Sequence, residues 1–328
     1  MKVYFLDVGQ GDCTFIKCPN GTTILVDCNI SNDDFLFWLE DKLPENDDGK
    51  KILDYLIITH PHEDHIKGIG KLKEYIIKNI WESGHRMYIP EEEQKDYPHY
   101  YDMLDLIQKV KKSGNNHKKL SAYNEMEITD EPDVKFLVLS PTKAYLEDEK
   151  PTERDIHDQC MVFRIEYKGI SIMFTGDSSM EAWKERIVPY YSDDSGRPNL
   201  LDSTFLHASH HGSYTFFKPK GKKDEDSYIT SIEKIDPKIT IISVGENNVH
   251  GKYSNNSSRC CRKLGRRCCR CQSGSNGRSC HWNCDMPWIR NRNWRICRRI
   301  SWRYSRSTGR QSSRGGNSKG CIQIEEVI

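Results

Sequence analysis

Three histidines and an aspartate lie within six residues, in the segment Thr59-His60-Pro61-His62-Glu63-Asp64-His65. Imidazole and carboxylate groups at such close spacing are typical of a metal-binding site. In an extended turn, His60 and His62 point to the same side and can share one ion, while Asp64 and His65 can reach a second ion. The segment therefore predicts a site for two divalent cations, and a solvated polar loop is the alternative.

The elements that would position this segment can be predicted from hydrophobic periodicity. Leu53–Thr59 leads directly into the histidines and has the continuous apolar character of a buried strand. The other expected strands are Lys2–Val8, Cys13–Cys18, Thr22–Asp27, Val134–Leu139, Cys160–Tyr167, Ile170–Thr175, Ser203–His207 and Ile239–Val244. The expected helices are Phe35–Leu43, Asp64–Ile77, Glu91–Lys112 and Ser179–Val188. This order predicts an α/β fold with two sheets between helices.

Six motifs resemble, in the same order, those of the metallo-β-lactamase-fold hydrolases, in the ComEC-like branch. They are Phe5–Asp12, Ile24–Asp27, His60–His65, Phe174–Asp177, His210–Ser213 and Ser243–Asn248. The resemblance covers residues 1–250 and implies a four-layer αββα sandwich. It also implies a dinuclear metal site along one edge of the sheets.

The resemblance assigns a role to each ligand-type side chain. The residues that it assigns to the metals are His60 and His62 for the first ion, Asp64 and His65 for the second, Asp177 as the bridge, and His210 as the further ligand that completes the coordination of the second ion. The first ion usually has a third histidine, and His157 is the candidate because it precedes the strand expected at Cys160–Tyr167. A surface position is the alternative for His157. An N-cap before the helix at Ser179 is the alternative for Asp177.

The expected catalytic residues are Asp64, Asp27 and His211. Adjacent His210 and His211 cannot both point inward if their segment is extended. We therefore expect His210 to bind metal and His211 or Ser213 to lie nearer the substrate. The proton that the leaving group needs can come from His211 or from a metal-bound water. Asp27 matches an acidic residue that, by the resemblance, orients the histidine loop; a turn cap is its alternative role.

The chemistry expected of two cations is hydrolysis. They lower the pKa of a bridging water to about 7, and the resulting hydroxide can attack a phosphodiester or another polarised ester or amide. Zinc is the expected metal, although manganese and iron also suit His and Asp ligands. The resembled branch contains nuclease-like modules, so a phosphodiester in DNA or RNA is the expected substrate, with lactam, lactone or thioester hydrolysis as alternatives. Lys218–Lys223 is a basic loop that can guide a phosphate.

Charge divides the chain into two unlike parts. Residues 1–250 contain 31 basic and 45 acidic residues, whereas residues 251–328 contain 18 basic and 3 acidic residues. Nine of the 13 cysteines also follow residue 250, and the motif pattern stops where Lys252-Tyr253 replace the expected His-Pro. We therefore expect a hydrolase domain at 1–251 and an Arg/Cys/Ser-rich tail at 252–328, which is disordered and originates from out-of-frame translation. The acidic charge of 1–250 does not favour broad binding of nucleic-acid phosphates.

Two other roles for the tail remain open. Arginines interleaved with Trp282, Trp288, Trp294 and Trp302 can bind single-stranded nucleic acid, which would make the chain a non-catalytic binding protein. The residues Cys268, Cys271, His281 and Cys284 have the spacing of a small zinc module. The sequence has no apolar run of about 18 residues and does not begin like a signal peptide. We therefore expect a cytoplasmic protein without a membrane partner.

Overall fold

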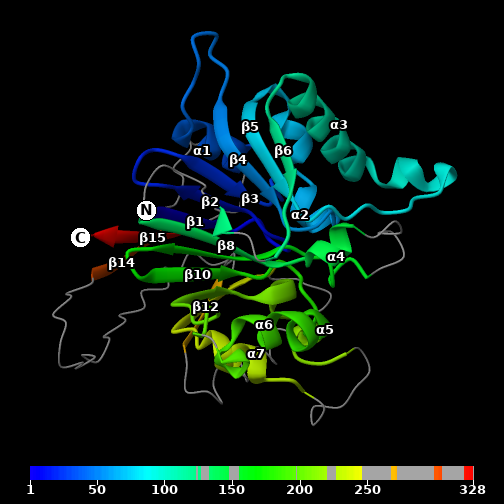
Figure 1. Ribbon diagram of the computed structural model, residues 1–328. Coiled ribbons are helices and arrows are strands. Elements are labelled where there is room, and N and C mark those ends of the chain that lie inside the picture. Colours follow the sequence, from blue (N-terminus) through cyan, green and yellow to red (C-terminus); the bar gives the residue numbers. More distant parts are fainter. Residues whose placement is uncertain are drawn as a thin grey trace.

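The computed structural model describes residues 1–122, 125–126, 133–147, 155–196, 198–219 and 227–245, together with strands at 267–271, 299–304 and 321–327. Its elements form four layers: two sheets pack face to face, and helices cover the outer surface of each sheet (Figure 1). The predicted α/β fold with two sheets between helices is therefore confirmed.

The first sheet carries the strand that leads into the histidine segment. Its strands, in spatial order, are β14 (Arg299–Tyr304), β15 (Cys321–Val327), β1 (Lys2–Leu6), β2 (Thr14–Lys17), β3 (Thr23–Val26), β4 (Ile52–Ile58), β5 (Ile76–Glu82) and β6 (Asn116–Lys119). Strands β3 to β6 run parallel, whereas the pairs from β14 to β3 are antiparallel. The helices α1 (Asp33–Lys42) and α3 (Pro98–Lys112) cover its outer face (Figure 1).

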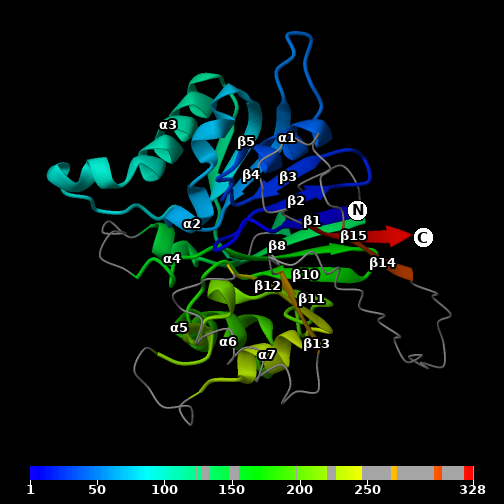
Figure 2. The ribbon, with the colours of Figure 1, turned by 180° about the vertical axis from the view of Figure 1, so that it is seen from behind.

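The second sheet lies below the first in Figure 1 and is seen from behind in Figure 2. Its order is β13 (Arg267–Cys271), β12 (Ile239–Ser243), β11 (Phe205–His207), β10 (Ile170–Phe174), β9 (Val162–Tyr167), β8 (Val134–Ser140) and β7 (Glu125–Met126). Strands β10 to β13 run parallel, and the others pair antiparallel. Its outer face is covered by α5 (Met180–Ala182), a π-helical turn at Trp183–Ile187, α6 (Val188–Tyr191) and α7 (Thr230–Ile235).

Alternate side chains of the central strands enter different hydrophobic cores. In β1, Val3 and Phe5 pack between the two sheets, whereas Tyr4 and Leu6 pack under α1 and α3. In β10, Met173 packs on the opposite side from the inter-sheet core, against the helices of the second sheet. Both faces of these strands are thus buried, which explains their continuous apolar sequences.

Two predicted helices differ from the structure. The helix expected at Asp64–Ile77 is wrong: α2 spans only Glu63–Ile66, a 3-10 turn covers Ile69–Glu74, and β5 begins at Ile76. Gly68 lies so close to the backbone of Ile30 that an added Cβ would be 2.7 Å from its nitrogen, so tertiary packing decides the conformation of this segment. The helix expected at Glu91–Lys112 is divided into a 3-10 turn and α3, because proline at the first position starts a new helix.

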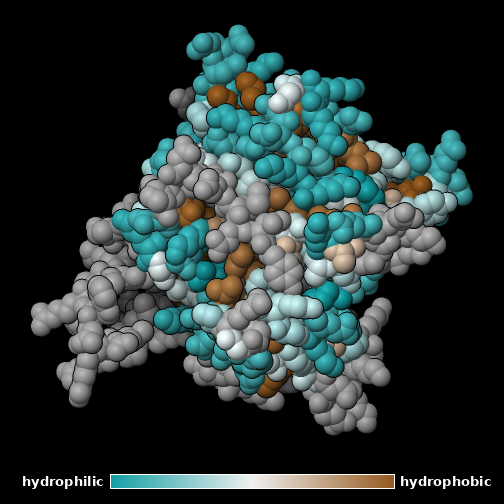
Figure 3. Space-filling model, viewed as in Figure 1, coloured by the Kyte–Doolittle hydropathy of each residue, from teal (hydrophilic) through white to brown (hydrophobic). Residues whose placement is uncertain are grey.

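The visible surface is mostly polar. In Figure 3, hydrophilic side chains dominate the region of α1 and α3, and hydrophobic ones form small separate groups. Among the helices in the described residues, none combines the length and apolar composition that a bilayer-spanning segment requires.

The predicted domain boundary near residue 251 falls outside the described residues. Beyond it, β15 pairs antiparallel with β1 and with β14, and β13 pairs parallel with β12. These strands extend both sheets. The disordered, out-of-frame tail stays a prediction for the rest of 252–328.

Candidate metal centre

The strand ends at one edge of the sheets bring the predicted site residues together. β4 leads into His60–His65, and β10 is followed by Thr175, Gly176 and Asp177. β11 leads into the 3-10 turn at Ser209–Gly212, and Asp27 directly follows β3. Because β3 and β4 are parallel neighbours, as are β10 and β11, their carboxyl ends meet at one edge.

The first ligand set consists of His60, His62, His157 and Asp177, whose ligand atoms all lie within 4.8 Å of one another. His62 Nδ1 is 3.0 Å from His60 Nε2 and 3.2 Å from His157 Nε2. Asp177 Oδ2 is 3.7 Å from His60 Nε2 and 3.9 Å from His157 Nε2. The structure therefore places His157 with the two predicted histidines rather than apart on the surface.

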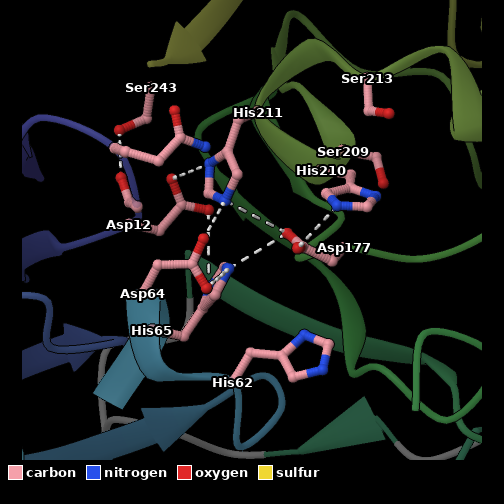
Figure 4. A network of polar contacts seen from close by, with 12 residues as sticks. Asp12, His62, Asp64, His65, Asp177, Ser209, His210, His211, Ser213 and Ser243 are labelled. Atoms are coloured by element: carbon pink, nitrogen blue, oxygen red, sulfur yellow. Dashed lines mark hydrogen bonds and ion pairs between the residues drawn. The ribbon is translucent and has the colours of Figure 1, made fainter. Parts of the chain in front are cut away.

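The second ligand set consists of Asp64, His65 and His211, which also lie within 4.8 Å, together with the other oxygen of Asp177. His211 Nε2 is 3.1 Å from Asp64 Oδ2 (Figure 4). His65 Nε2 is 3.1 Å from Asp177 Oδ1. The carboxylate of Asp177 thus faces one set with each oxygen. The helix cap that was the alternative for Asp177 is made by Ser179, whose side chain accepts from Ala182 N.

His211, and not His210, lies in the second ligand set. The two residues adopt φ values of 53° and 49°, so the segment is a left-handed turn and not extended. Both rings consequently face Asp177: His211 Nε2 is 3.8 Å from Oδ1 and His210 Nε2 is 3.7 Å from Oδ2. His210 Nδ1 is 2.8 Å from Thr215 Oγ1, and 30% of its side chain is exposed. His211 therefore takes the place in the second ligand set that was predicted for His210.

Asp27 connects the end of β3 to the histidine segment. It accepts hydrogen bonds from Thr59 N at 2.8 Å and Thr59 Oγ1 at 2.7 Å, and its Oδ2 is 2.8 Å from His65 Nδ1. A carboxylate that contacts Nδ1 of a histidine fixes the orientation of the ring. Nε2 of His65 then points away from Asp27 and toward Asp177. This is the arrangement that the resemblance implied for Asp27.

One buried residue of the site had no role in the sequence analysis. Asp12 follows β1 and lies within the predicted motif Phe5–Asp12, but nothing in its local sequence marks it as part of a metal centre. In the structure its ligand atoms group with those of Asp177 and His211 and with those of Asp27 and His65. The motif resemblance was the only sequence signal that could have found it.

Two histidines of the first ligand set, His60 and His62, are neutral at pH 7. Burial lowers the pKa of His60 well below its usual range, and burial is the largest cause that lowers the pKa of His62 to about 4. Neutral imidazole is the form that binds a metal. These side chains can therefore take up a cation at neutral pH without first losing a proton.

The second ligand set is an array of opposite charges. Burial opposes ionisation of Asp64, but the hydrogen bond from His211 and the charge of His65 lower its pKa to about 2. Burial likewise opposes protonation of His65 and His211, but the charge of Asp177 raises the pKa of both well above the usual range. Protons therefore occupy positions that a divalent cation can take, and their release would accompany metal binding.

Several buried polar atoms of the centre make no hydrogen bond, although some of them lie in ion pairs. Among the described residues, His65 Nε2, Asp177 Oδ1, His211 Nδ1 and Asp12 Oδ1 have no hydrogen-bond partner. Unpaired polar atoms are costly in a protein interior. Their chemistry, imidazole nitrogen and carboxylate oxygen, fits two divalent cations.

A sequence model of the metallo-beta-lactamase superfamily matches residues 6–220. No curated protein matches the chain. Among solved structures, the chain is similar to the metallo-beta-lactamase fold protein YhfI from Bacillus subtilis, with 13% sequence identity and a TM-score of 0.47. That alignment covers 84% of this chain and 98% of YhfI. It is also similar to Zn²⁺-bound PqqB from Methylobacterium extorquens, with 11% sequence identity and a TM-score of 0.46. That alignment covers 82% of this chain and 98% of PqqB.

Proposed function

Because the chain belongs to the metallo-beta-lactamase superfamily, whose members are generally metal-dependent hydrolases, we propose that it is a dinuclear hydrolase that cleaves phosphodiesters. The observation that carries the proposal is the position of Asp177, whose two oxygens face two sets of ligand-type side chains. The first set, with three imidazoles, suits zinc. The second set contains more carboxylate and also suits manganese or iron.

The side chains divide the work of the reaction. Two bound cations would supply Lewis acidity for a phosphoryl group and lower the pKa of water to about 7. Asp27 holds His65 and the backbone at Thr59 in place. His210 lies outside both ligand sets, is partly exposed, and faces Asp177 with Nε2 while Thr215 holds its Nδ1. His210 is therefore the histidine that we assign to contact a substrate oxygen.

Two features support a phosphodiester over a neutral substrate. Lys218 follows the turn that carries His211, and its Nζ lies 5.6 Å from the ring centre of Tyr214. A cation beside an aromatic ring is a combination that contacts phosphates and bases in nucleic-acid sites. The motif resemblance to the ComEC-like branch supports DNA or RNA as the source of the phosphodiester. The remaining lysines of the predicted basic loop, at 220–223, lie outside the described residues.

A cytoplasmic location belongs to the same proposal. Among the described residues, the buried cysteines Cys13, Cys28 and Cys160 form no disulfide. Reduced thiols fit a reducing compartment. The alternative function, nucleic-acid binding by the tail without catalysis, rests only on tail composition, because the side chains of the tail lie outside the described part of the chain.

The proposal can be tested with metal analysis followed by turnover. Protein purified without chelator should contain about two divalent ions per chain, as expected for a dinuclear site. It should hydrolyse bis(4-nitrophenyl) phosphate and labelled DNA or RNA oligonucleotides, and Asp64→Ala should abolish hydrolysis. The same preparations should be assayed with a lactam, a lactone and a thioester. Turnover of one of these with none on phosphodiesters would overturn the substrate class. Oligonucleotide binding without hydrolysis, unchanged by Asp64→Ala, would support the binding-protein alternative instead.

A further inference from the structure

Asp12 lies beside the second ligand set and faces Nδ1 of His211, the ring nitrogen that does not face Asp64 (Figure 4). Its side chain is 3% exposed, and its Oδ1 is 3.6 Å from His211 Nδ1. The other ring nitrogen of His211 is the one that is 3.1 Å from Asp64 Oδ2. Asp12 Oδ1 and His211 Nδ1 both lack a hydrogen-bond partner among the described residues. The distance between these two atoms is slightly too long for a hydrogen bond, and Asp12 Oδ1 also lies 3.4 Å from Nε2 of the buried His207.

The loop that carries Asp12 is fixed against the segment that carries Asp64. Gly11 has a φ of +121°, and an added Cβ there would lie 2.2 Å from Asp64 O, so only glycine permits this approach. Asp12 N donates to Asp64 O at 3.1 Å, and Asn29 N donates to Asp12 O at 3.1 Å. Ser243 Oγ donates to Gly11 O at 2.5 Å. Asp12 and Asp64 therefore hold fixed positions, each at a different ring nitrogen of His211.

The histidines of the first ligand set have different groups behind them. His60 Nδ1 lies 3.2 Å from the hydroxyl of Thr59 and 3.7 Å from the thiol of Cys160, both neutral groups. His157 Nδ1 is 3.9 Å from Asp155, a carboxylate whose side chain is 65% exposed to water. An exposed carboxylate is screened by solvent and adds little to the field at the site.

Both histidines of the second set, in contrast, have a buried carboxylate behind them. Asp27 lies 2.8 Å from His65 Nδ1, and Asp12 lies 3.6 Å from His211 Nδ1. A carboxylate in this position fixes the ring and raises the basicity of the nitrogen that binds the metal. Buried charges are also screened much less than exposed ones, so these two anions attract a cation strongly.

We propose that Asp12 is a positioning residue for His211, and that Asp12 and Asp27 together make the second ligand set bind a divalent cation before the first set does. This inference rests on the proposed dinuclear site. The two sites consequently fill in order, and the order is determined by residues that do not themselves bind the metal.

The order of filling can be measured with Mn²⁺, which suits a ligand set that contains carboxylates. Metal-free full-length protein is titrated with Mn²⁺, and the signal of free Mn²⁺ is followed by electron paramagnetic resonance. We expect one tight and one weaker binding step. Asp12→Asn should weaken the tight step by about 10- to 100-fold and leave the weaker step unchanged. His62→Ala, which removes a ligand of the first set, should abolish the weaker step alone.

A matched control and a second measurement keep the test independent of folding defects. Asp54→Asn also neutralises a largely buried carboxylate, but Asp54 contacts Thr23 and Lys78 and not the metal centre, so both binding steps should be unchanged. Crystals of the wild type with one equivalent of Mn²⁺ should show an anomalous peak among Asp64, His65 and His211.

Specific outcomes would overturn the inference. One is that Asp12→Asn leaves the affinity of the tight Mn²⁺-binding step unchanged. Another is that the first anomalous peak lies in the ligand set that contains His62. A third is that His62→Ala loses the tight binding step. A wild type that binds two Mn²⁺ ions in the expected order but does not cleave phosphodiesters contradicts the proposed function and supports this inference. A wild type that binds no Mn²⁺ contradicts both.

Discussion

Two clusters of buried charged residues lie at strand ends of this protein, and they differ in how their polar atoms are paired. The Glu82 cluster (Glu82, Arg86 and His117) is at the end of β5. Glu82 accepts from Arg86 with both oxygens, at 2.6 and 2.5 Å, and its Oε1 is 2.6 Å from His117 Nε2. In the metal centre, by contrast, Asp177 Oδ1 and His65 Nε2 lie 3.1 Å apart but neither has a hydrogen-bond partner among the described residues.

Burial of charge alone therefore does not identify a functional site. Glu82 and Asp177 are both at most 3% exposed, and burial opposes ionisation of both carboxyls. The Glu82 cluster neutralises itself with a guanidinium, so it needs no further ligand. The metal centre combines an excess of carboxylate and imidazole with unpaired atoms, which is the condition that a bound cation would relieve.

The largest expected effect comes from Asp177→Asn, because this residue faces both ligand sets. We expect metal content to fall from about two ions per chain to nearly none, and hydrolysis to fall by more than the roughly 10- to 100-fold typical of a residue behind a ligand. Adding metal should stabilise the wild type by about 2.7 kcal/mol at 100 times the dissociation constant. Thermal unfolding of the variant should not respond to metal. Retention of two ions by Asp177→Asn would contradict the shared-carboxylate geometry.

Removing a ligand from one set alone should have a smaller effect. His62→Ala removes the imidazole whose Nδ1 lies within 3.2 Å of both His60 and His157. We expect metal content to fall to about one ion per chain while the second ligand set stays loaded. Elemental analysis after dialysis measures this directly. Loss of both ions in His62→Ala would show that the two sets cannot be filled independently.

The sequence predicted the metal centre where local pattern determines geometry. His60 and His62 follow a buried strand and alternate along an extended turn, so their common direction follows from the strand period. His211 was misplaced because the prediction assumed an extended backbone, and the left-handed φ at two consecutive histidines is not encoded in the residue types. Asp12 was missed because its partners come from distant parts of the chain. Such contacts depend on how the two sheets pack, which the local sequence does not specify.

The Glu82 cluster should contribute stability without contributing to metal binding. Burial alone would raise the pKa of Glu82, but hydrogen bonds from Arg86 and His117 lower it from 4.5 to about 2. A lowered carboxyl pKa means that the stabilisation is present above about pH 4.5 and is lost as the pH falls toward 2.

Glu82→Gln leaves the guanidinium of Arg86 without its charged partner, so the free energy of unfolding should fall by about 3 kcal/mol at pH 7. The difference from the wild type should shrink as the pH falls from 4.5 toward 2, because the carboxyl of the unfolded wild type is then protonated while that of the folded protein is still ionised, which favours unfolding. Urea unfolding of metal-free protein between pH 3 and 7 measures both quantities. A pH-independent difference would argue against the ion pair, and a reduced metal content would contradict the separation of the two clusters.

The smallest expected effect is at a helix cap remote from both clusters. Asn32 caps α1, and its Oδ1 accepts a hydrogen bond from Phe35 N at 3.2 Å. Asn32→Ala should lower the free energy of unfolding by about 1 kcal/mol, because the amide of Phe35 loses its partner. Metal content and hydrolysis should be unchanged, since α1 packs on the outer face of the first sheet and supplies no side chain to either ligand set. Urea unfolding with metal analysis on the same samples provides the test. A loss of metal in Asn32→Ala would mean that metal content falls whenever the protein is destabilised. The metal losses expected for Asp177→Asn and His62→Ala would then no longer show that these side chains bind the metal.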